Sequence, residues 1–198
     1  MPLIKSISGF RGTIGGKADN GLTPIDIVKL TSSFICLIRR SGVSRPRIVV
    51  GRDGRISGTM VNQLVCGNLQ AMGADVIDIG LSTTPTVEVA VTEMKADGGV
   101  ILTASHNPRE WNALKLLNSK GEFISKEDGE WLLEKAAADD YEFSYIDEIG
   151  TYSVENDWIE RHADMVCNLP LVKKDVIANA NLKVVVDAVN STGGIAIP

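Results

Sequence analysis

The stretch that decides the fold runs Gly98-Gly99-Val100-Ile101-Leu102-Thr103-Ala104-Ser105-His106-Asn107-Pro108. Its apolar run, residues 100–102, is typical of a buried strand, and the run ends at small and polar residues closed by a proline, which has no N–H to donate to a sheet. In an α/β domain, the loop that follows the carboxyl end of a strand is where ligands bind. Ser105 and His106 therefore lie in a candidate nucleophile loop.

Two simpler interpretations of this loop stay open on the residues alone. Serine and asparagine form turns, and Asn-Pro favours turn initiation, so the segment also fits a capped corner without chemistry. A serine hydrolase fits less well, because the Gly-x-Ser-x-Gly elbow is missing. Adjacent side chains also point apart, which places His106 poorly as a base for Ser105.

A longer string of residues carries a family resemblance. Residues 103–108 (Thr-Ala-Ser-His-Asn-Pro), followed by residues 112–115 (Asn-Ala-Leu-Lys), closely resemble the phosphoserine loop of the α-D-phosphohexomutases. These are the phosphoglucomutases, phosphomannomutases and phosphoglucosamine mutases, which usually have Gly where this chain has Ala113. The resemblance implies that Ser105 carries the phosphoryl group and gives an oxygen to Mg²⁺. It also implies that His106 or Lys115 handles the proton of the sugar hydroxyl.

A second matching element is Gly9-Phe10-Arg11-Gly12, at the end of a strand expected over residues 4–12. On its own, Arg11 fits a solvated turn. The family opens with a strand leading to Gly-x-Arg-Gly, whose arginine lies near the phosphoserine, although the usual Phe-Gly-Thr is replaced here by residues 5–7 (Lys-Ser-Ile). The catalytic residues implied by the resemblance are Ser105, His106, Lys115 and Arg11. The substrate-binding residues it implies are Arg11, Ser105, His106, Asn107 and Lys115.

Strands and helices alternate along the first 140 residues. Strands are expected at 47–51, 75–80, 100–103 and 112–117, the last turned back at 118–121 so that Lys115 returns beside the Ser105 loop. Helices are expected to start at Thr23, Ser57, Thr84 and Ser125. The inward residues expected on the first two helices are Val28, Phe34, Ile35, Ile38, Met60, Leu64, Leu69 and Met72. This order predicts a three-layer αβα domain with a mostly parallel mixed sheet covered on both faces.

The strand at 47–51 is followed by Arg52-Asp53-Gly54-Arg55. Asp53 with Arg52 or Arg55 fits either an active-site pair or a local ion pair that fixes the loop. The family has Gly-x-Asp-x-Arg at this place, and we interpret it as mainly architectural.

The chain is expected to divide into a phosphoserine-loop domain (1–140), a polar linker (141–155) and the incomplete beginning of a second α/β domain (156–198). The last part is predicted to hold a helix over 156–169, with His162 on its polar face, and a buried strand over 182–187. Full-length relatives continue with an acidic metal loop, a sugar-selecting loop and a phosphate-binding domain, none of which occurs here. We therefore expect a piece of a longer enzyme that has negligible turnover alone. Residues 171–198 are expected to be weakly ordered or paired with something outside the chain.

Composition restricts the remaining function classes. The 198 residues carry a net charge of −5 with no basic cluster, which argues against nucleic-acid or acidic-membrane partners. No apolar run approaches the length of a membrane span, and the N-terminus lacks a signal pattern. Cys36 and Cys66 fit buried thiols rather than ligands or disulfides, and Cys167 stands apart from both. These features favour a cytoplasmic protein.

The function implied by the resemblance is a phosphohexomutase that interconverts hexose 1-phosphate and 6-phosphate through a phosphoserine and a sugar bisphosphate, with Mg²⁺ as cofactor. The sugar stays open among glucosamine, mannose and glucose phosphates, and the sequence does not determine the oligomeric state. The alternative is a non-catalytic regulatory or assembly relative of the mutases. The intact Ser105, His106, Asn107 and Lys115 argue against that alternative.

Overall fold

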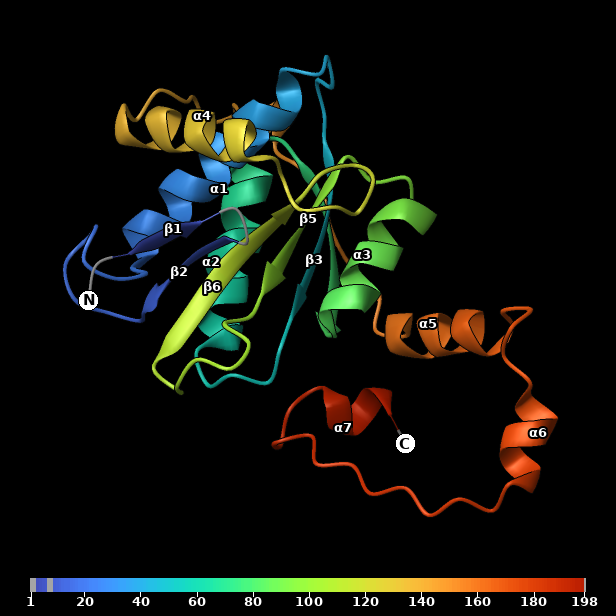
Figure 1. Ribbon diagram of the computed structural model, residues 1–198. Helices are drawn as coiled ribbons and strands as arrows, with labels where there is room; N and C mark the ends of the chain where they lie inside the picture. The colour runs from blue at the N-terminus through green and yellow to red at the C-terminus, as the bar shows by residue number, and fades with distance from the viewer. Residues whose placement is uncertain (1–2, 7–8, 198) are drawn as a thin grey trace.

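The computed structural model describes residues 3–6 and 9–197, and within them a seven-stranded mixed sheet forms the centre of the molecule (Figure 1). The strands are β1 (Ile4–Ser6), β2 (Gly9–Thr13), β3 (Arg47–Arg52), β4 (Asp75–Leu81), β5 (Gly98–Leu102), β6 (Trp111–Leu117) and β7 (Tyr152–Val154). Their order across the sheet is β1-β2-β6-β5-β3-β4-β7. Strands β2, β3, β4, β5 and β7 run in one direction, and only β1 and β6 of the described strands run against them.

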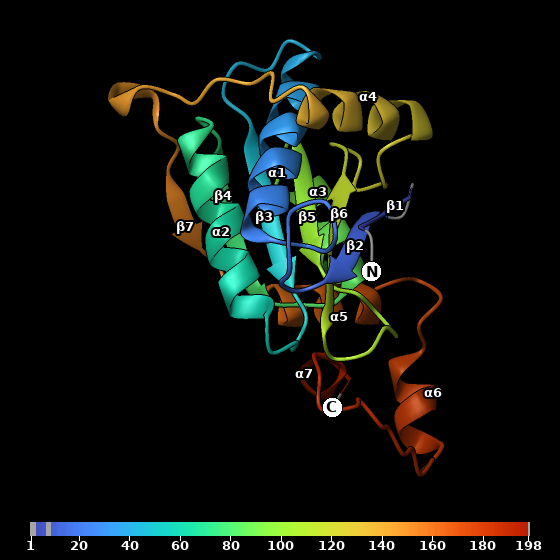
Figure 2. The same ribbon diagram turned by 90° about the vertical axis from the view of Figure 1, so that its left-hand side faces the viewer.

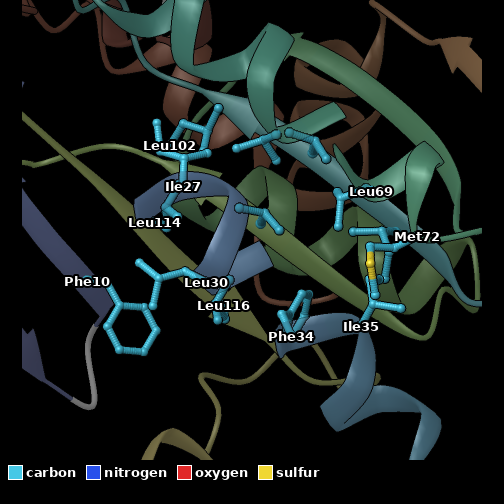
Figure 3. Packing of buried hydrophobic residues seen from close by; sticks show 14 of the residues in the cluster. Phe10, Ile27, Leu30, Phe34, Ile35, Leu69, Met72, Leu102, Leu114 and Leu116 are labelled. Atoms are coloured by element: carbon cyan, nitrogen blue, oxygen red, sulfur yellow. The ribbon is translucent and has the colours of Figure 1, made fainter. Parts of the chain in front are cut away.

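Helices cover both faces of the sheet, which confirms the predicted three-layer αβα fold. Helices α1 (Pro24–Arg39), α2 (Gly58–Ala71) and α4 (Lys126–Ala137) lie on one side, and α3 (Thr84–Glu93) and α5 (Trp158–Cys167) lie on the other (Figures 1 and 2). Both faces need cover because the side chains of a strand alternate between them. In β5, Val100 and Leu102 pack under α1 and α2, and Ile101 packs under α3. Figure 3 shows the larger cluster, where Phe34 and Leu69 meet the sheet residues.

Two helix details differ from the sequence expectation. Thr83, rather than Thr84, caps α3 by accepting a hydrogen bond from the Thr86 N–H. Met60 is exposed, although it was expected to point inward, because Val61 begins the buried stripe of α2. Positions on one face of a helix recur every three or four residues, and position 60 lies outside the face formed by the buried positions 58, 61, 62 and 65.

The expected strand over residues 4–12 is two strands. Ile7 and Ser8, between β1 and β2 in the sequence, lie outside the described residues. Arg11 lies within β2, where it pairs with Ala113 of β6, and is therefore not a turn residue. The backbone that carries the Arg11 side chain is therefore part of the sheet and not of a solvated loop.

The segment expected as a linker, residues 141–155, extends the sheet. Strand β7 pairs in parallel with β4, and the Tyr152 hydroxyl donates to the Asp78 Oδ2 atom at 2.8 Å. The backbone of the preceding residues bonds to the end of α2, where the Gly150 N–H donates to the Gln70 carbonyl at 2.9 Å. Polarity suggested a linker, but half of an edge strand's surface is exposed and tolerates polar residues.

The C-terminal part of the chain runs away from the sheet through α5 and α6 (Lys174–Asn179) and returns as α7 (Gly193–Ala196) below the strand ends (Figure 1). The buried strand predicted over 182–187 is wrong: this segment has no regular structure, and Val185 is 96% exposed. A strand needs a neighbour for its backbone groups, and no described strand pairs with this segment. His162 is half-buried with its Nδ1 atom 3.0 Å from the Thr86 hydroxyl, so the expectation that it lies on the polar face of its helix is also wrong.

The three cysteines are all thiols. Cys66 is buried, Cys36 is half-buried and Cys167 is exposed. Burial raises the pKa of both the Cys36 and the Cys66 thiols, which makes their reactive thiolate forms scarcer. Among the described helices, none has the length and apolar character needed to cross a membrane.

Candidate active site

The site is built where two neighbouring parallel strands end. Strands β3 and β5 lie side by side in register, with Arg52 opposite Leu102. The turn from β3 to α2 (residues 53–57) and the loop from β5 to β6 (residues 103–110, the serine loop) therefore emerge at the same edge of the sheet. The Asp53 N–H donates to the Leu102 carbonyl at 3.1 Å, which joins the two segments at their roots. This is the position at which α/β sheets bind ligands.

A cleft of about 440 Å³ opens between these two loops and the turn that precedes α7. Its lining residues are Asp53, Gly54, Arg55, Ile56, Ser105, His106, Asn107, Arg109, Val189, Asn190 and Ser191. The predicted residues Ser105, His106 and Asn107 thus lie together at one cleft, and the Gly54 N–H donates to the Ser191 hydroxyl at 3.3 Å across it. The small polar run before α7 was not predicted to be part of the site.

Ser105 has a fixed backbone and an exposed side chain. Its φ of 52° lies in the left-handed region, which residues other than glycine seldom adopt. Its N–H donates to the Thr103 hydroxyl at 3.1 Å, and the Asn107 N–H donates to the Ala104 carbonyl at 3.0 Å. Within the described part of the chain, the Ser105 hydroxyl has no hydrogen-bond partner. The loop therefore presents this hydroxyl to the cleft, ready for a ligand atom.

Arg55 is the residue that the sequence analysis weighted too lightly. Its Nε atom lies 3.2 Å from Asp53 Oδ2, so the ion pair of this turn joins Asp53 to Arg55 and not to Arg52. The Arg55 side chain is only 11% exposed, and its guanidinium donates to carbonyls of the serine loop. The Gly-x-Asp-x-Arg pattern was the available signal, but a pattern does not show which backbone atoms an arginine reaches.

Arg11 and Lys115 lie beside the cleft rather than in its lining. They occupy adjacent strands, and their pairing with Ala113 and Ile101 places both side chains on the α3 face of the sheet. The Lys115 Nζ atom lies 5.7 Å from the centre of the Phe123 ring. Lys115 was expected to lie beside the Ser105 loop, but it is not among the residues that line the cleft.

The charges around Lys115, including that of Arg11, shift the pKa of its amine. Burial lowers the pKa of Lys115, the charge of Arg11 lowers it further, and the Glu88 and Asp53 carboxylates oppose this shift. The Arg11 Nε atom is buried and has no acceptor among the described residues. A buried N–H without a partner costs free energy, so this edge of the sheet is suited to bind an anion.

A metal site is not formed by the described residues alone. They contain no group of three or more His, Cys, Asp or Glu side chains arranged to hold a metal ion. The one carboxylate in the cleft lining, Asp53, is engaged by Arg55. Mg²⁺ prefers six oxygen ligands, of which carboxylates usually supply one or two. The described side chains therefore do not fit Mg²⁺ by themselves.

Comparison with known proteins identifies the fold and the loop together. The family model described as "Phosphoglucomutase/phosphomannomutase, alpha/beta/alpha domain I" matches residues 4–142, which include β1 to β6 and the serine loop. The chain belongs to the phosphoglucomutase/phosphomannomutase family. As an αβα domain I of this family, it has its serine loop at the same end of the sheet as the α2 N-terminus.

Relatives found by the comparison are longer than this chain. A phosphoglucomutase/phosphomannomutase of Thermococcus kodakarensis is 36% identical over 189 residues, covering 94% of this chain and 41% of the relative. A phosphoglucosamine mutase of Nautilia profundicola is 36% identical over 154 residues, covering 76% of this chain and 34% of the relative. The open form of a Paramecium phosphoglucomutase, parafusin, shares the fold with a TM-score of 0.76 at 16% identity, covering 97% of this chain and 39% of that structure. The chain thus spans about two fifths of the length of such family members.

Proposed function

We propose that this chain supplies the phosphoserine part of a phosphohexomutase, with Ser105 as the phosphoryl carrier. The observation that carries the proposal is the state of Ser105: a backbone fixed in the left-handed region, with a hydroxyl exposed to a polar cleft and without a partner among the described residues. A carrier serine needs this arrangement, because phosphoryl transfer depends on positioning a nucleophile in line with the phosphorus. We also propose the division into domain I (1–140) and the start of domain II (156–198), joined by residues 141–155, whose strand β7 adds to the sheet of domain I.

The proposed reaction moves one phosphoryl group at a time. The bond between phosphorus and the Ser105 oxygen breaks as a bond from phosphorus to a hydroxyl oxygen of a hexose phosphate forms. The hydroxyl proton passes to Lys115 or His106, which gives it to the released Ser105 oxygen, so that the serine hydroxyl is restored. The bisphosphate then turns over, and its other phosphate returns to the serine with the proton moving in reverse. Arg11 faces the negative charge, and Asn107 contributes to substrate binding in the cleft.

The lowered pKa of Lys115 supports its role as the proton acceptor. Burial and the neighbouring charge of Arg11 lower the pKa of Lys115, so this amine gives up its own proton more readily than an ordinary lysine and is better suited to act as a base. Mg²⁺ would take an oxygen of the phosphate on Ser105, with further ligands from outside the described residues. We therefore expect negligible steady-state mutase turnover from these 198 residues alone, whereas a single stoichiometric transfer from a bisphosphate to Ser105 requires no turnover.

The test is phosphorylation of Ser105 in the chain as it stands. The protein is incubated with glucose 1,6-bisphosphate or glucosamine 1,6-bisphosphate and MgCl₂, and its intact mass and peptide map are recorded. We expect one phosphate on Ser105 in the wild-type chain and in Ser119→Ala, which removes an exposed serine of the 118–121 turn. Ser105→Ala is expected to stay unmodified. A phosphate mapped to another residue, or no difference between the two variants, contradicts the proposal.

A further inference from the structure

The Arg55 guanidinium uses every donor it has within this site. Arginine has five guanidinium N–H groups, one on Nε and two on each terminal nitrogen. The Nε group donates to Asp53 Oδ2 at 3.2 Å. Nη1 donates to the carbonyls of Pro108 and Trp111 at 2.8 and 2.9 Å, and Nη2 donates to those of Ser105 and Asn107, both at 2.7 Å. The guanidinium therefore has no N–H left for a ligand.

These four carbonyls lie on both legs of the serine loop. Ser105 and Asn107 belong to the leg that leaves β5, Pro108 belongs to the leg that leads to β6, and Trp111 is the first residue of β6. The two terminal nitrogens of a guanidinium are held apart in one plane, so one side chain can bind both legs at once. Asp53 fixes that plane from the other side, through Nε and through the Arg55 backbone N–H at 3.0 Å. The result is a clamp made by one residue outside the loop.

The serine loop needs such a clamp because its conformation is strained. A residue other than glycine is strained in the left-handed region and stays there only where its surroundings enforce it. Ser105 and His106 are exposed, so side-chain packing does not hold that part of the loop. The neighbouring tie, from Asn112 Nδ2 to the Ser57 hydroxyl at 3.0 Å, holds only the outgoing leg.

We propose that Arg55 is a positioning residue for the phosphoryl carrier: it holds Ser105 in its left-handed conformation by clamping both legs of the serine loop, and it does not bind the substrate. The proposal concerns the same site as the proposed function and rests on it for the purpose of the clamp. The contacts of the clamp are made to Asp53 and to backbone carbonyls, and none is made to the Ser105 hydroxyl.

The experiment is NMR and hydrogen exchange on the 198-residue chain and its variants. In the wild type, we expect slow exchange of the Arg55 Nε proton and a three-bond HN–Hα coupling of Ser105 that reports positive φ. In Arg55→Ala, we expect the Ser105 and Asn107 amides to exchange about tenfold faster or more, because three hydrogen bonds to the loop and one to Trp111 at the start of β6 are lost. The Ser105 coupling is expected to shift to that of an ordinary negative φ.

Two further variants keep the test decisive. Arg47→Ala removes an exposed arginine from the first residue of β3, at the opposite end of the strand from the loop, and should leave the loop amides unchanged. Arg55→Lys keeps the charge beside Asp53 but carries its donors on a single nitrogen, so we expect partial rescue: amide exchange between that of the wild type and that of Arg55→Ala. If Arg55→Ala fails to fold, Arg55→Lys is compared with the wild type alone.

The proposal is overturned if the exchange and the Ser105 coupling in Arg55→Lys, and in a folded Arg55→Ala, equal those of the wild type. Failure of the proposed function is distinguishable from this result. A wild-type chain that takes no phosphate from glucose 1,6-bisphosphate contradicts the carrier role and leaves the clamp intact. A wild-type chain that is phosphorylated while the variants keep a native loop contradicts the clamp alone.

Discussion

Replacing Tyr152 by phenylalanine tests whether strand β7 is an integral part of the sheet. The Tyr152 hydroxyl donates to Asp78 Oδ2 at 2.8 Å, and the Asp78 side chain is buried in β4. A hydrogen bond to a charged group contributes about 1.5–3 kcal/mol. Asp78 keeps donors from Asn62 Nδ2 at 2.6 Å and from the Gly80 N–H at 2.8 Å, so we expect the lower end of that range.

The expected loss is about 1.5 kcal/mol in the free energy of unfolding, or a fall of roughly 3–6 °C in Tm for a chain of this size. Urea denaturation followed by circular dichroism measures the first quantity and calorimetry the second. The matched control is Tyr145→Phe, because Tyr145 is 84% exposed, and it should change the stability by less than about 0.5 kcal/mol. Equal stabilities of the two variants would refute the reasoning, because β7 would then add nothing through this hydrogen bond to the stability of the sheet.

The stability difference between the wild type and Tyr152→Phe should also depend on pH. Burial, and then the hydrogen bond to Asp78, raise the pKa of Tyr152 to about 12 from its ordinary value of 10.0. Between these two values the folded protein binds more protons than the unfolded chain, so its stability falls as the pH rises. The stabilisation is fully present below pH 10, and we expect the wild type to lose stability above that pH more steeply than Tyr152→Phe.

Two further predictions concern glycines and a lysine. Gly99→Ala should destabilise the protein by about 1–3 kcal/mol, because the added Cβ would lie 2.6 Å from Val91 Cγ2. Gly67→Ala in α2 should stabilise the protein by about 0.5–1 kcal/mol, because a Cβ there meets nothing within 4 Å. Urea denaturation of both variants checks the opposite signs. Glu88→Gln should lower the pKa of Lys115 further, as read by NMR titration of ¹³C-methylated lysines, because the Glu88 carboxylate now raises it. Since the folded pKa of Lys115 lies below the ordinary 10.5, stability rises with pH between the two values, and the variant should widen that window.

The sequence predicted the first 140 residues well for a physical reason. Strands such as residues 100–102 are short apolar runs, and the helix start at Thr23-Pro24 carries its own local signal; the structure has Thr23 and Asp26 in a reciprocal capping box. These signals act within a few residues, so they can be recognised without knowing what lies nearby in space. The serine loop was found in the same way, from consecutive residues.

The errors came from contacts between distant residues. Polarity suggested a linker where β7 pairs with β4, some 75 residues away in sequence, as the partners Tyr152 and Val76 show. An apolar run suggested a strand at 182–187, but a strand requires a neighbour, and none of the described strands provides it. In both cases the same local pattern also occurs in segments that have a different secondary structure, so the pattern alone could not decide between them.

The sequence by itself determined the αβα class, the position of Ser105 after a buried strand, and the family, because each depends on residues adjacent in the chain. Only the tertiary structure decided that Asp53 pairs with Arg55, and that Arg55 binds the loop some 50 residues further on. It alone placed Arg11 and Lys115 on the α3 face, outside the lining of the cleft. The reason is that hydrogen bonds and charge interactions act through space, whereas a pattern in a sequence records only order along the chain.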